Sequence, residues 1–164
     1  MINTGEFIIR TIEEKDIDII QKWNTAEFRG EYQECQLESK QALIQQYNKD
    51  GFYSESFQML GIEVNQELTG LIYINFIRKG FVGLGVVICK EERNKGLGVK
   101  ITSAIVEYLF SNYDVCRIQA DTDINNIPAQ KVLEKSGFEK EGVLRKYRYH
   151  HGKYNDSVVY SIVR

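Results

Sequence analysis

The segment that most constrains the fold is a nearly continuous apolar run at residues 81–89, which reads Phe-Val-Gly-Leu-Gly-Val-Val-Ile-Cys. Such apolarity predicts a central strand covered on both faces. A polar loop follows, and a helix is predicted from about residue 96 to 112, with the apolar stripe Leu97, Ile101, Ile105 and Leu109. A further strand at 115–122 would complete a β-α-β unit with a right-handed crossover.

The rest of the chain shows no repeat, linker or low-complexity tract, and its 164 residues suit one domain. We therefore predict a single domain, 1–164, of the α+β class, with a mixed sheet flanked by helices. Strands are expected at 7–12, 57–64, 68–77, 138–149 and 154–163, a loop at 25–37, and helices from Asp16, at 37–47, and after Asn125 or Asn126 as the cap.

Composition excludes several classes of function. The net charge of −2 lacks the basic excess of nucleic-acid binders, and the balance argues against an anionic membrane surface as a partner. No stretch has the length of a membrane span, and residues 1–6 do not resemble a signal peptide, so we expect a cytoplasmic protein. Cys35, Cys89 and Cys116 match no metal-binding spacing, so no metal is expected, and Cys89 and Cys116 lie in apolar runs that predict burial.

The loop before the long helix carries the chemistry, with the sequence Arg93-Asn94-Lys95-Gly96-Leu97-Gly98. Its two glycines permit a tight turn, and the free amides of the first helical turn, together with the helix dipole, favour a phosphate or pyrophosphate. Arg93 and Lys95 would add positive charge. The alternative is an ordinary glycine-rich turn with solvated charges. The loop is neither a Walker loop nor a dinucleotide fingerprint, because it lacks the Gly-Lys-Ser/Thr ending and the third glycine.

This Arg-x-x-Gly-x-Gly pattern resembles the acyl-CoA signature of the GNAT superfamily of N-acetyltransferases. Residues 126–138, Asn-Ile-Pro-Ala-Gln-Lys-Val-Leu-Glu-Lys-Ser-Gly-Phe, resemble its second signature. Further matches are typical of the RimJ/RimL branch, which acetylates the N-termini of ribosomal proteins: Ile9-Arg10-x-Ile12, Asp16, Trp23, residues 141–145, Gly152 and Asp156.

The resemblance implies a mostly antiparallel sheet of six to seven strands. The fourth and fifth predicted strands, 81–89 and 115–122, would be its central strands and would splay apart. The resemblance also implies that the pantetheine arm of acetyl-CoA pairs with the backbone of Val86, Val87 and Ile88. The amides of residues 93–98 would hold the pyrophosphate. Asn126 would contact the pantetheine or orient the thioester, and it also suits a plain helix N-cap.

The implied reaction is direct transfer of an acetyl group from acetyl-CoA to a primary amine, with a general base that accepts the amine proton. Asp121 is the candidate base and Asp123 a weaker one, and a solvated strand carboxylate is the alternative for Asp121. The tyrosine of many family members and the serine of RimL-like members are replaced by Leu133 and Ala129. Tyr147 and Tyr149 are then the candidate proton donors; the alternatives are that they are packing residues of a strand and that water, or no dedicated acid, returns the proton.

The acceptor is not specified by the sequence. A small amine or a protein N-terminus both suit the reaction, and the acidic residues Glu27, Glu31, Glu34 and Glu38 would either attract a cationic acceptor or form a solvated face. The family resemblance is also compatible with a homodimer, since many members pair. The missing tyrosine and serine keep a second interpretation open, in which the chain is a non-catalytic acyl-CoA-binding module or sensor.

Overall fold

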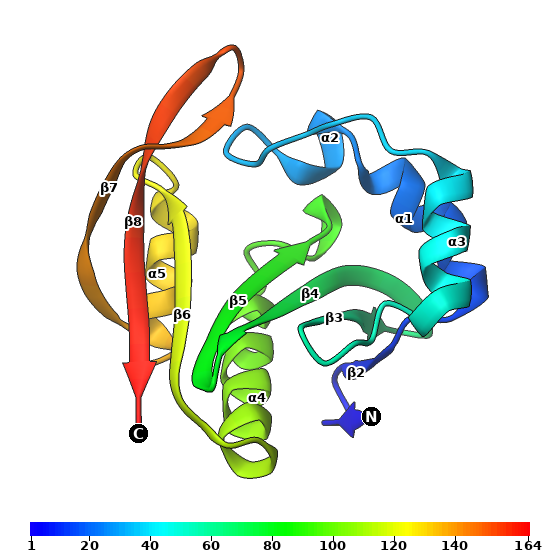
Figure 1. Cartoon of the computed structure of the whole chain (residues 1–164), viewed down its shortest axis with the longest axis horizontal. Coiled ribbons are helices and arrows are strands. Elements are labelled where there is room, and N and C mark those ends of the chain that lie inside the picture. The colour runs from blue at the N-terminus through cyan, green and yellow to red at the C-terminus, as the bar shows by residue number, and fades with distance from the viewer.

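The computed structural model describes residues 1–164, the side chain of Ala26 excepted. One sheet of eight strands is built in the order β1-β2-β3-β4-β5-β6-β8-β7 (Figure 1). The strands are β1 Ile2–Asn3, β2 Ile8–Thr11, β3 Phe57–Val64, β4 Glu67–Arg78, β5 Gly80–Ile88, β6 Val115–Asp123, β7 Glu139–His150 and β8 Lys153–Val163. The α-helices are α1 Ile17–Trp23, α2 Ala26–Arg29, α3 Lys40–Asp50, α4 Leu97–Asn112 and α5 Ile127–Lys135, with short 3-10 turns at Glu14–Asp16 and Lys90–Glu92.

The sheet divides into two halves that part from one another between β5 and β6. Every neighbouring pair of strands is antiparallel except β5 and β6, which run parallel on either side of the crossover helix α4. Their pairing begins at Gly80 and Val115 and ends at Gly83 and Gln119, so the last five residues of β5 have no partner in β6. This confirms the predicted parting of the central strands, which is visible in Figure 1.

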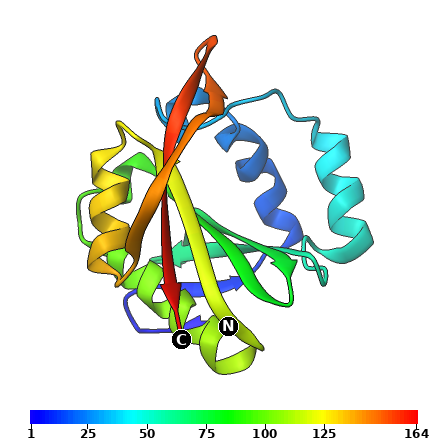
Figure 2. The ribbon, with the colours of Figure 1, turned by 60° about the vertical axis from the view of Figure 1, so that its left-hand side comes forward.

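Helices cover both faces of the sheet (Figure 2), and a hydrophobic cluster lies beneath the helices on each face. The larger one packs α4 and α5 against the strands, with Ile101, Ile105 and Leu109 fully buried. The predicted apolar stripe of α4 is therefore confirmed. The smaller one packs α1 and α3 against β3 and β4 through residues such as Ile20 and Leu43. Both faces are thus covered, which leaves the gap between β5 and β6 as the opening in the sheet.

The region before β3 differs from the sequence prediction. The predicted loop 25–37 contains the short helix α2, and the helix predicted at 37–47 runs instead from Lys40 to Asp50. Ser39 caps it by accepting a hydrogen bond from the Ala42 amide (3.4 Å), and Gly51 ends it in the left-handed conformation with φ of 62°. The capping signals at Ser39 and Gly51 decide both ends, whereas the prediction followed apolar spacing alone.

Three further predictions need correction. The sheet has eight strands instead of six or seven, because the two-residue β1 adds an edge strand. The strand predicted at 81–89 is central, but its second half is only partly buried because it borders the opening. Cys116 is exposed rather than buried. Its thiol lies 3.4 Å from the Gly80 carbonyl oxygen.

No helix among the residues described is long and apolar enough to cross a membrane.

A buried ion-pair network ties β2 to the start of α1. The Arg10 guanidinium contacts the carboxylates of Asp16 (2.7 Å) and Glu63 (2.7 Å), and Asp16 also accepts the Glu13 amide (2.8 Å). Burial opposes the charge on Asp16, but the hydrogen bonds from Arg10 and Glu13 outweigh it, so the pKa of Asp16 lies below its usual 3.8. The side chain of Asp16 therefore anchors the first helix as an ionised group.

We expect Asp16→Asn to lower the free energy of unfolding by about 2 kcal/mol at neutral pH, because it leaves a buried guanidinium with one carboxylate fewer. Since the folded pKa of Asp16 is depressed, its contribution is present above its usual pKa and is lost as the pH falls through the folded value. Urea denaturation between neutral and acidic pH measures this. The free energy of unfolding of the variant should fall less on acidification than that of the wild type. If the two proteins lost the same free energy of unfolding over this pH range, the lowered pKa of Asp16 would be contradicted.

Candidate active site

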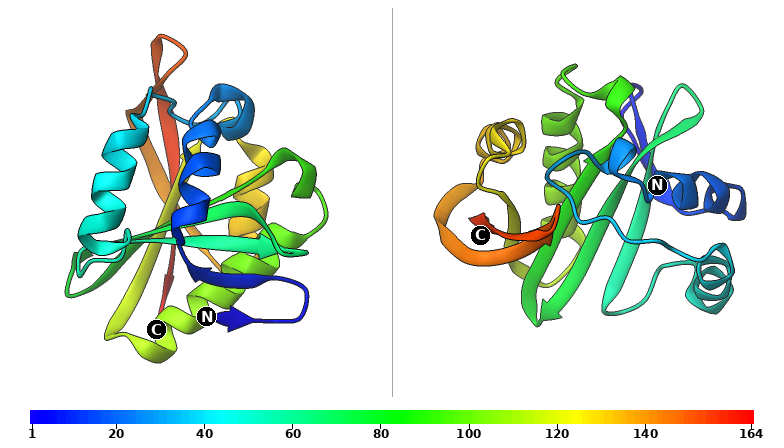
Figure 3. Two further views of the ribbon diagram at one scale, coloured as in Figure 1. Left: turned by 90° about the vertical axis from the view of Figure 1, so that its right-hand side faces the viewer. Right: turned by 90° about the horizontal axis from the view of Figure 1, so that it is seen from above.

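A large cleft of about 1080 Å³ occupies the opening between β5 and β6. Its walls come from the second half of β5, the start of α4, the end of β6, the exposed face of α5, and residues 29–33 at the end of α2 and directly after it. Seen from above, α2 and the segment that follows it lie over the sheet (Figure 3, right). The structure therefore brings the two sequence signatures, which lie about one helix and one strand apart in the chain, into the lining of one cavity, where Gly98 lies next to Val132.

The backbone edge of β5 forms one wall of the cleft. The Cys89 amide donates to the Thr69 carbonyl oxygen of β4 (2.8 Å). From there β4 and β5 pair without a bulge, with Gly70 opposite Ile88 at one end of this stretch and Tyr73 opposite Gly85 at the other. Because amides alternate between the two edges of a strand, those of Val86 and Ile88 point away from β4 and toward the cleft. The cleft thus presents unpaired main-chain donors and acceptors to any extended polar chain that enters it.

The glycine loop closes one end of the cleft at the start of α4. Gly96 is the N-cap with φ of 77°, and Asn94 also has positive φ, at 63°. A Cβ on Gly96 would meet nothing within 4 Å, so open space lies in front of the helix start. Within the described chain, the backbone amides from Asn94 to Gly98 have no hydrogen-bond acceptor. Together with the helix dipole, this geometry suits a phosphate or pyrophosphate group.

Arg93 has a structural contact that the sequence did not reveal. Its Nε donates to the Ile88 carbonyl oxygen (2.8 Å) and its Nη2 to the Phe28 carbonyl oxygen (2.6 Å), so the side chain fastens α2 to the end of β5. Lys95 is paired with Glu92 at 3.0 Å. The Arg93 guanidinium and the Lys95 ammonium group therefore both have protein partners, whereas the sequence suggested that they would add positive charge for a phosphate. The Leu97 side chain is buried in the core, and the loop would act mainly through its backbone.

Helix α5 forms the opposite wall. Asn126 accepts the Ala129 amide (3.3 Å) and donates to the Thr122 hydroxyl (3.1 Å), which confirms its role as an N-cap. The side chain also lines the cleft. Lys131 and Lys135 line the cleft from the same helix, and neither has an ion-pair partner among the described residues. They are the cations that the structure offers to an anionic ligand on this wall.

Asp121 lines the cleft from β6 and is bound by Arg148 of β7. Both Arg148 hydrogen bonds to the carboxylate, from Nη2 (2.8 Å) and Nε (3.1 Å), end on Oδ2, and Nε also contacts the Ser157 hydroxyl (2.9 Å). Oδ1 has no protein partner within the described part of the chain. The ion pair therefore fixes the carboxylate while one oxygen stays available.

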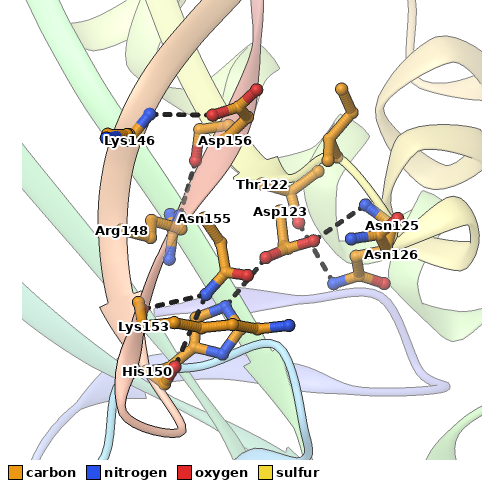
Figure 4. A network of polar contacts seen from close by, with 12 residues as sticks. Thr122, Asp123, Asn125, Asn126, Lys146, Arg148, His150, Lys153, Asn155 and Asp156 are labelled. Atoms are coloured by element: carbon orange, nitrogen blue, oxygen red, sulfur yellow. Dashed lines mark hydrogen bonds and ion pairs between the residues drawn. The ribbon is translucent and has the colours of Figure 1, made fainter.

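Asp123 belongs to a buried pair rather than to the cleft (Figure 4). Its carboxylate, 1% exposed, lies 2.8 Å from Nε2 of His150, and its other oxygen accepts the Asn125 amide (2.8 Å). Burial opposes ionisation, but these hydrogen bonds prevail, so the pKa of Asp123 is lowered. The His150–Asp123 contact joins the β7–β8 hairpin to the turn before α5. The sequence did not reveal this contact, because His150 falls between the predicted strands 138–149 and 154–163.

The tyrosines considered as proton donors lie away from the cleft. Tyr147 and Tyr149 are 56% and 55% exposed, and neither lines the cavity. A bulge between Leu144 and Arg148 takes Tyr147 out of regular pairing with β8. Leu133 lines the cleft at the position where the family's tyrosine was expected. The structure thus brings Asp121 and Asn126 together but does not bring Tyr147 to them.

Two side chains of the cleft were not predicted at all. Tyr73 of β4 lies beside Gly85, where a Cβ would be 3.7 Å from the tyrosine, and burial raises the pKa of its hydroxyl. Arg29 of α2 approaches that hydroxyl from above, with 3.5 Å between Nη2 and Oη. Tyr73 sits in an apolar strand whose spacing gave no sign of a cavity. Arg29 lies in a segment predicted as a loop.

Comparisons with known proteins identify the family to which this fold belongs. A family model described as an acetyltransferase (GNAT) domain matches residues 9–159. The chain is 31% identical over 171 residues to the uncharacterized N-acetyltransferase YoaA of Bacillus subtilis (strain 168), covering 100% of this chain and 97% of that one. The chain therefore belongs to the GNAT family and is an acyl-CoA-dependent N-acetyltransferase.

Other similarities are more distant or shorter. The crystal structure of spermidine N-acetyltransferase from Vibrio cholerae in complex with CoA and spermine superposes with a TM-score of 0.87 at 23% identity, covering 98% of this chain and 96% of that one. This likeness establishes the shared fold. Aminoglycoside N(6')-acetyltransferase type 1 of Klebsiella pneumoniae is 44% identical over 54 residues, which are 33% of this chain and 27% of that protein.

Proposed function

We propose that the cleft binds acetyl-CoA along the free edge of β5 and that the chain acetylates a primary amine of a small acceptor molecule. The observation that carries this proposal is the early end of the β5–β6 pairing, at Gly83 and Gln119. It leaves the amides of Val86 and Ile88 facing a cavity that the glycine loop closes. A pantetheine arm carries amides of its own and suits this edge, and the helix start suits a pyrophosphate.

In the proposed reaction acetyl-CoA supplies a thioester whose carbonyl carbon is attacked by the neutral amine. A nitrogen–carbon bond forms and the carbon–sulfur bond breaks. We propose that the Val86 amide donates to the carbonyl oxygen as negative charge develops there. We propose that Oδ1 of Asp121 accepts the amine proton, directly or through water, while Arg148 holds Oδ2.

The sulfur of the departing thiolate must regain a proton. Leu133 cannot provide one, and Tyr147 lies outside the cleft. We therefore place no step on Tyr147 and propose that water in the open cleft protonates the thiolate. Asn126, fixed as the cap of α5, would contact the pantetheine arm from the opposite wall.

For the acceptor, we favour a small amine over a protein N-terminus. The similar proteins whose names state an acceptor act on spermidine and aminoglycosides, both small amines. A RimJ/RimL-like role on ribosomal proteins rests on the sequence resemblance alone, and Ala129 stands where that branch often has serine. A homodimer is also part of the proposal, and the exposed tyrosines Tyr147, Tyr149 and Tyr154 of the β7–β8 hairpin offer a surface for it.

The second candidate is a non-catalytic acyl-CoA sensor, which the presence of Leu133 in the cleft favours. We expect the wild-type chain to release free CoA thiol from acetyl-CoA when it is mixed with a panel of primary amines, at a rate well above the amine-free control. A thiol-reactive dye measures this release. Acetyl-CoA binding without release in any amine pool would favour the sensor and contradict the transferase.

A further inference from the structure

Arg29 is an incompletely satisfied cation inside the cleft. Its Nε is buried without a hydrogen-bond partner, and its single side-chain hydrogen bond is the long 3.5 Å contact from Nη2 to the Tyr73 hydroxyl. No carboxylate of the described residues forms an ion pair with it. A guanidinium has five donors, and one that is buried without a partner, as Nε is here, is costly. This pattern favours an anionic ligand at this position.

The acidic residues that follow α2 form no ion pair with Arg29. Glu38 accepts a hydrogen bond from the Asn24 side chain (3.2 Å), and Glu31 raises the pKa of the neighbouring Tyr32 hydroxyl. Both are exposed. The other arginines of the cleft are already engaged, Arg93 by two backbone carbonyls and Arg148 by Asp121. Arg29 is thus the arginine of this cavity that retains binding capacity.

The backbone around Arg29 is held in place before any ligand enters. The Arg29 amide donates to the Thr25 carbonyl oxygen (2.9 Å), and the preceding carbonyl, that of Phe28, accepts a hydrogen bond from Arg93 (2.6 Å). The Phe28 ring stacks on Trp23 with centroids 4.2 Å apart and planes 4° from parallel. Helix α2 therefore presents the guanidinium from a fixed position, which reduces the entropy cost of binding.

The place of this guanidinium points to the acceptor rather than to CoA. Tyr73, which it contacts, faces Gly85 across the β4–β5 ladder, next to Val86. The glycine loop, where the phosphates would lie, begins beyond the other end of this strand segment, after Ile88. A group bound between Arg29 and Tyr73 would thus sit close to the proposed reacting carbonyl.

We propose that Arg29 and the Tyr73 hydroxyl form a subsite for a carboxylate of the acceptor, so that the acceptor is an amino acid or a close derivative with a free carboxylate. The guanidinium would bind the carboxylate through two parallel hydrogen bonds, and the tyrosine would add a third donor. The adjacent amine would then be directed toward Val86. This inference rests on the proposed function and narrows its substrate class.

Matched acceptors test the subsite on the wild-type protein. Each pair consists of an amino acid and the amine that lacks only its carboxylate: phenylalanine with phenethylamine, lysine with cadaverine, and alanine with ethylamine. We expect kcat/KM for at least one amino acid to exceed that of its partner amine by about 10- to 100-fold, as for a hydrogen bond to a charged group. Equal rates, or a preference for the amines throughout, would overturn the subsite and leave the proposed function standing. No release with any acceptor would overturn both.

Variants locate the effect. Arg29→Gln should raise KM for the preferred amino acid by about 10-fold or more and leave the partner amine within about 2-fold. Arg78→Gln is the matched control, because Arg78 is exposed at the far end of β4, where it lies over the Phe81 ring. CoA affinity should be the same in all three proteins. A loss of CoA affinity in Arg29→Gln would assign the guanidinium to the CoA phosphates and overturn the proposal.

Discussion

Replacing Gly96 with valine is expected to abolish the thermal stabilisation that CoA gives to the wild-type chain. Gly96 has φ of 77°, a conformation that a β-branched residue adopts only with strain, and its side chain would enter the open space before α4. At a CoA concentration 100 times the dissociation constant, the wild type should gain about 2.7 kcal/mol, or about 5–10 °C for a chain of this size. The variant should show less than about 1 °C.

The hairpin glycine Gly152 offers a matched control for this experiment. It is exposed, has φ of 75°, and like Gly96 has nothing within 4 Å of the position of a Cβ. Gly152→Val should therefore cost similar backbone strain but keep the full CoA-dependent shift, because it lies outside the cleft lining. Differential scanning fluorimetry compares the two directly. Equal shifts in both variants would show that the glycine loop does not hold CoA.

Replacing Val86 with proline is expected to lower kcat by about 100- to 1000-fold, the usual effect of removing one donor to a developing oxyanion. Proline removes the amide hydrogen, which faces the cleft rather than β4, and it also replaces the valine side chain with a ring that fixes φ at about −65°. Loss of the pairing with β4 is therefore not expected, and the thermal midpoint should fall only slightly. Steady-state release of CoA thiol measures kcat.

Val87→Pro is the contrasting variant for this prediction. Its amide points toward β4 in the same alternation, so proline there should break the ladder opposite Leu71 and strongly reduce stability. If Val86→Pro instead keeps kcat within about 3-fold of the wild type, a main-chain donor at this position is not needed for the reaction. If Val86→Pro unfolds as readily as Val87→Pro, the assigned direction of the two amides is wrong.

The segments that would bind the cofactor in the proposed site were predictable because local chemistry determines them. The apolar run at 81–89 required a central strand, the stripe of α4 required a helix packed on the sheet, and Asn126 with Pro128 specified the start of α5. Family resemblance supplied the parting of β5 and β6, which no periodicity could show. The sequence therefore identified β5, the start of α4 and the start of α5, three of the segments that line the cleft.

The side-chain contacts in and around the cleft were not predictable, since they join segments far apart in the chain. Arg93 is 65 residues from its partner Phe28, and Arg148 is 27 residues from Asp121. His150 is joined to Asp123 across the same separation of 27 residues. Spacing within one element carries no information about such pairs. The bulge that removes Tyr147 from regular pairing was equally unpredictable from spacing. A bulge changes the face of the sheet on which the following residues lie.

A crystal structure of the chain grown with saturating CoA tests the central claim most directly. We expect density for the pantetheine arm between β5 and β6, with hydrogen bonds to the amides of Val86 and Ile88. The pyrophosphate should lie against the amides from Asn94 to Gly98. A cleft that remains empty at saturating CoA, or CoA bound at another surface, would contradict the account.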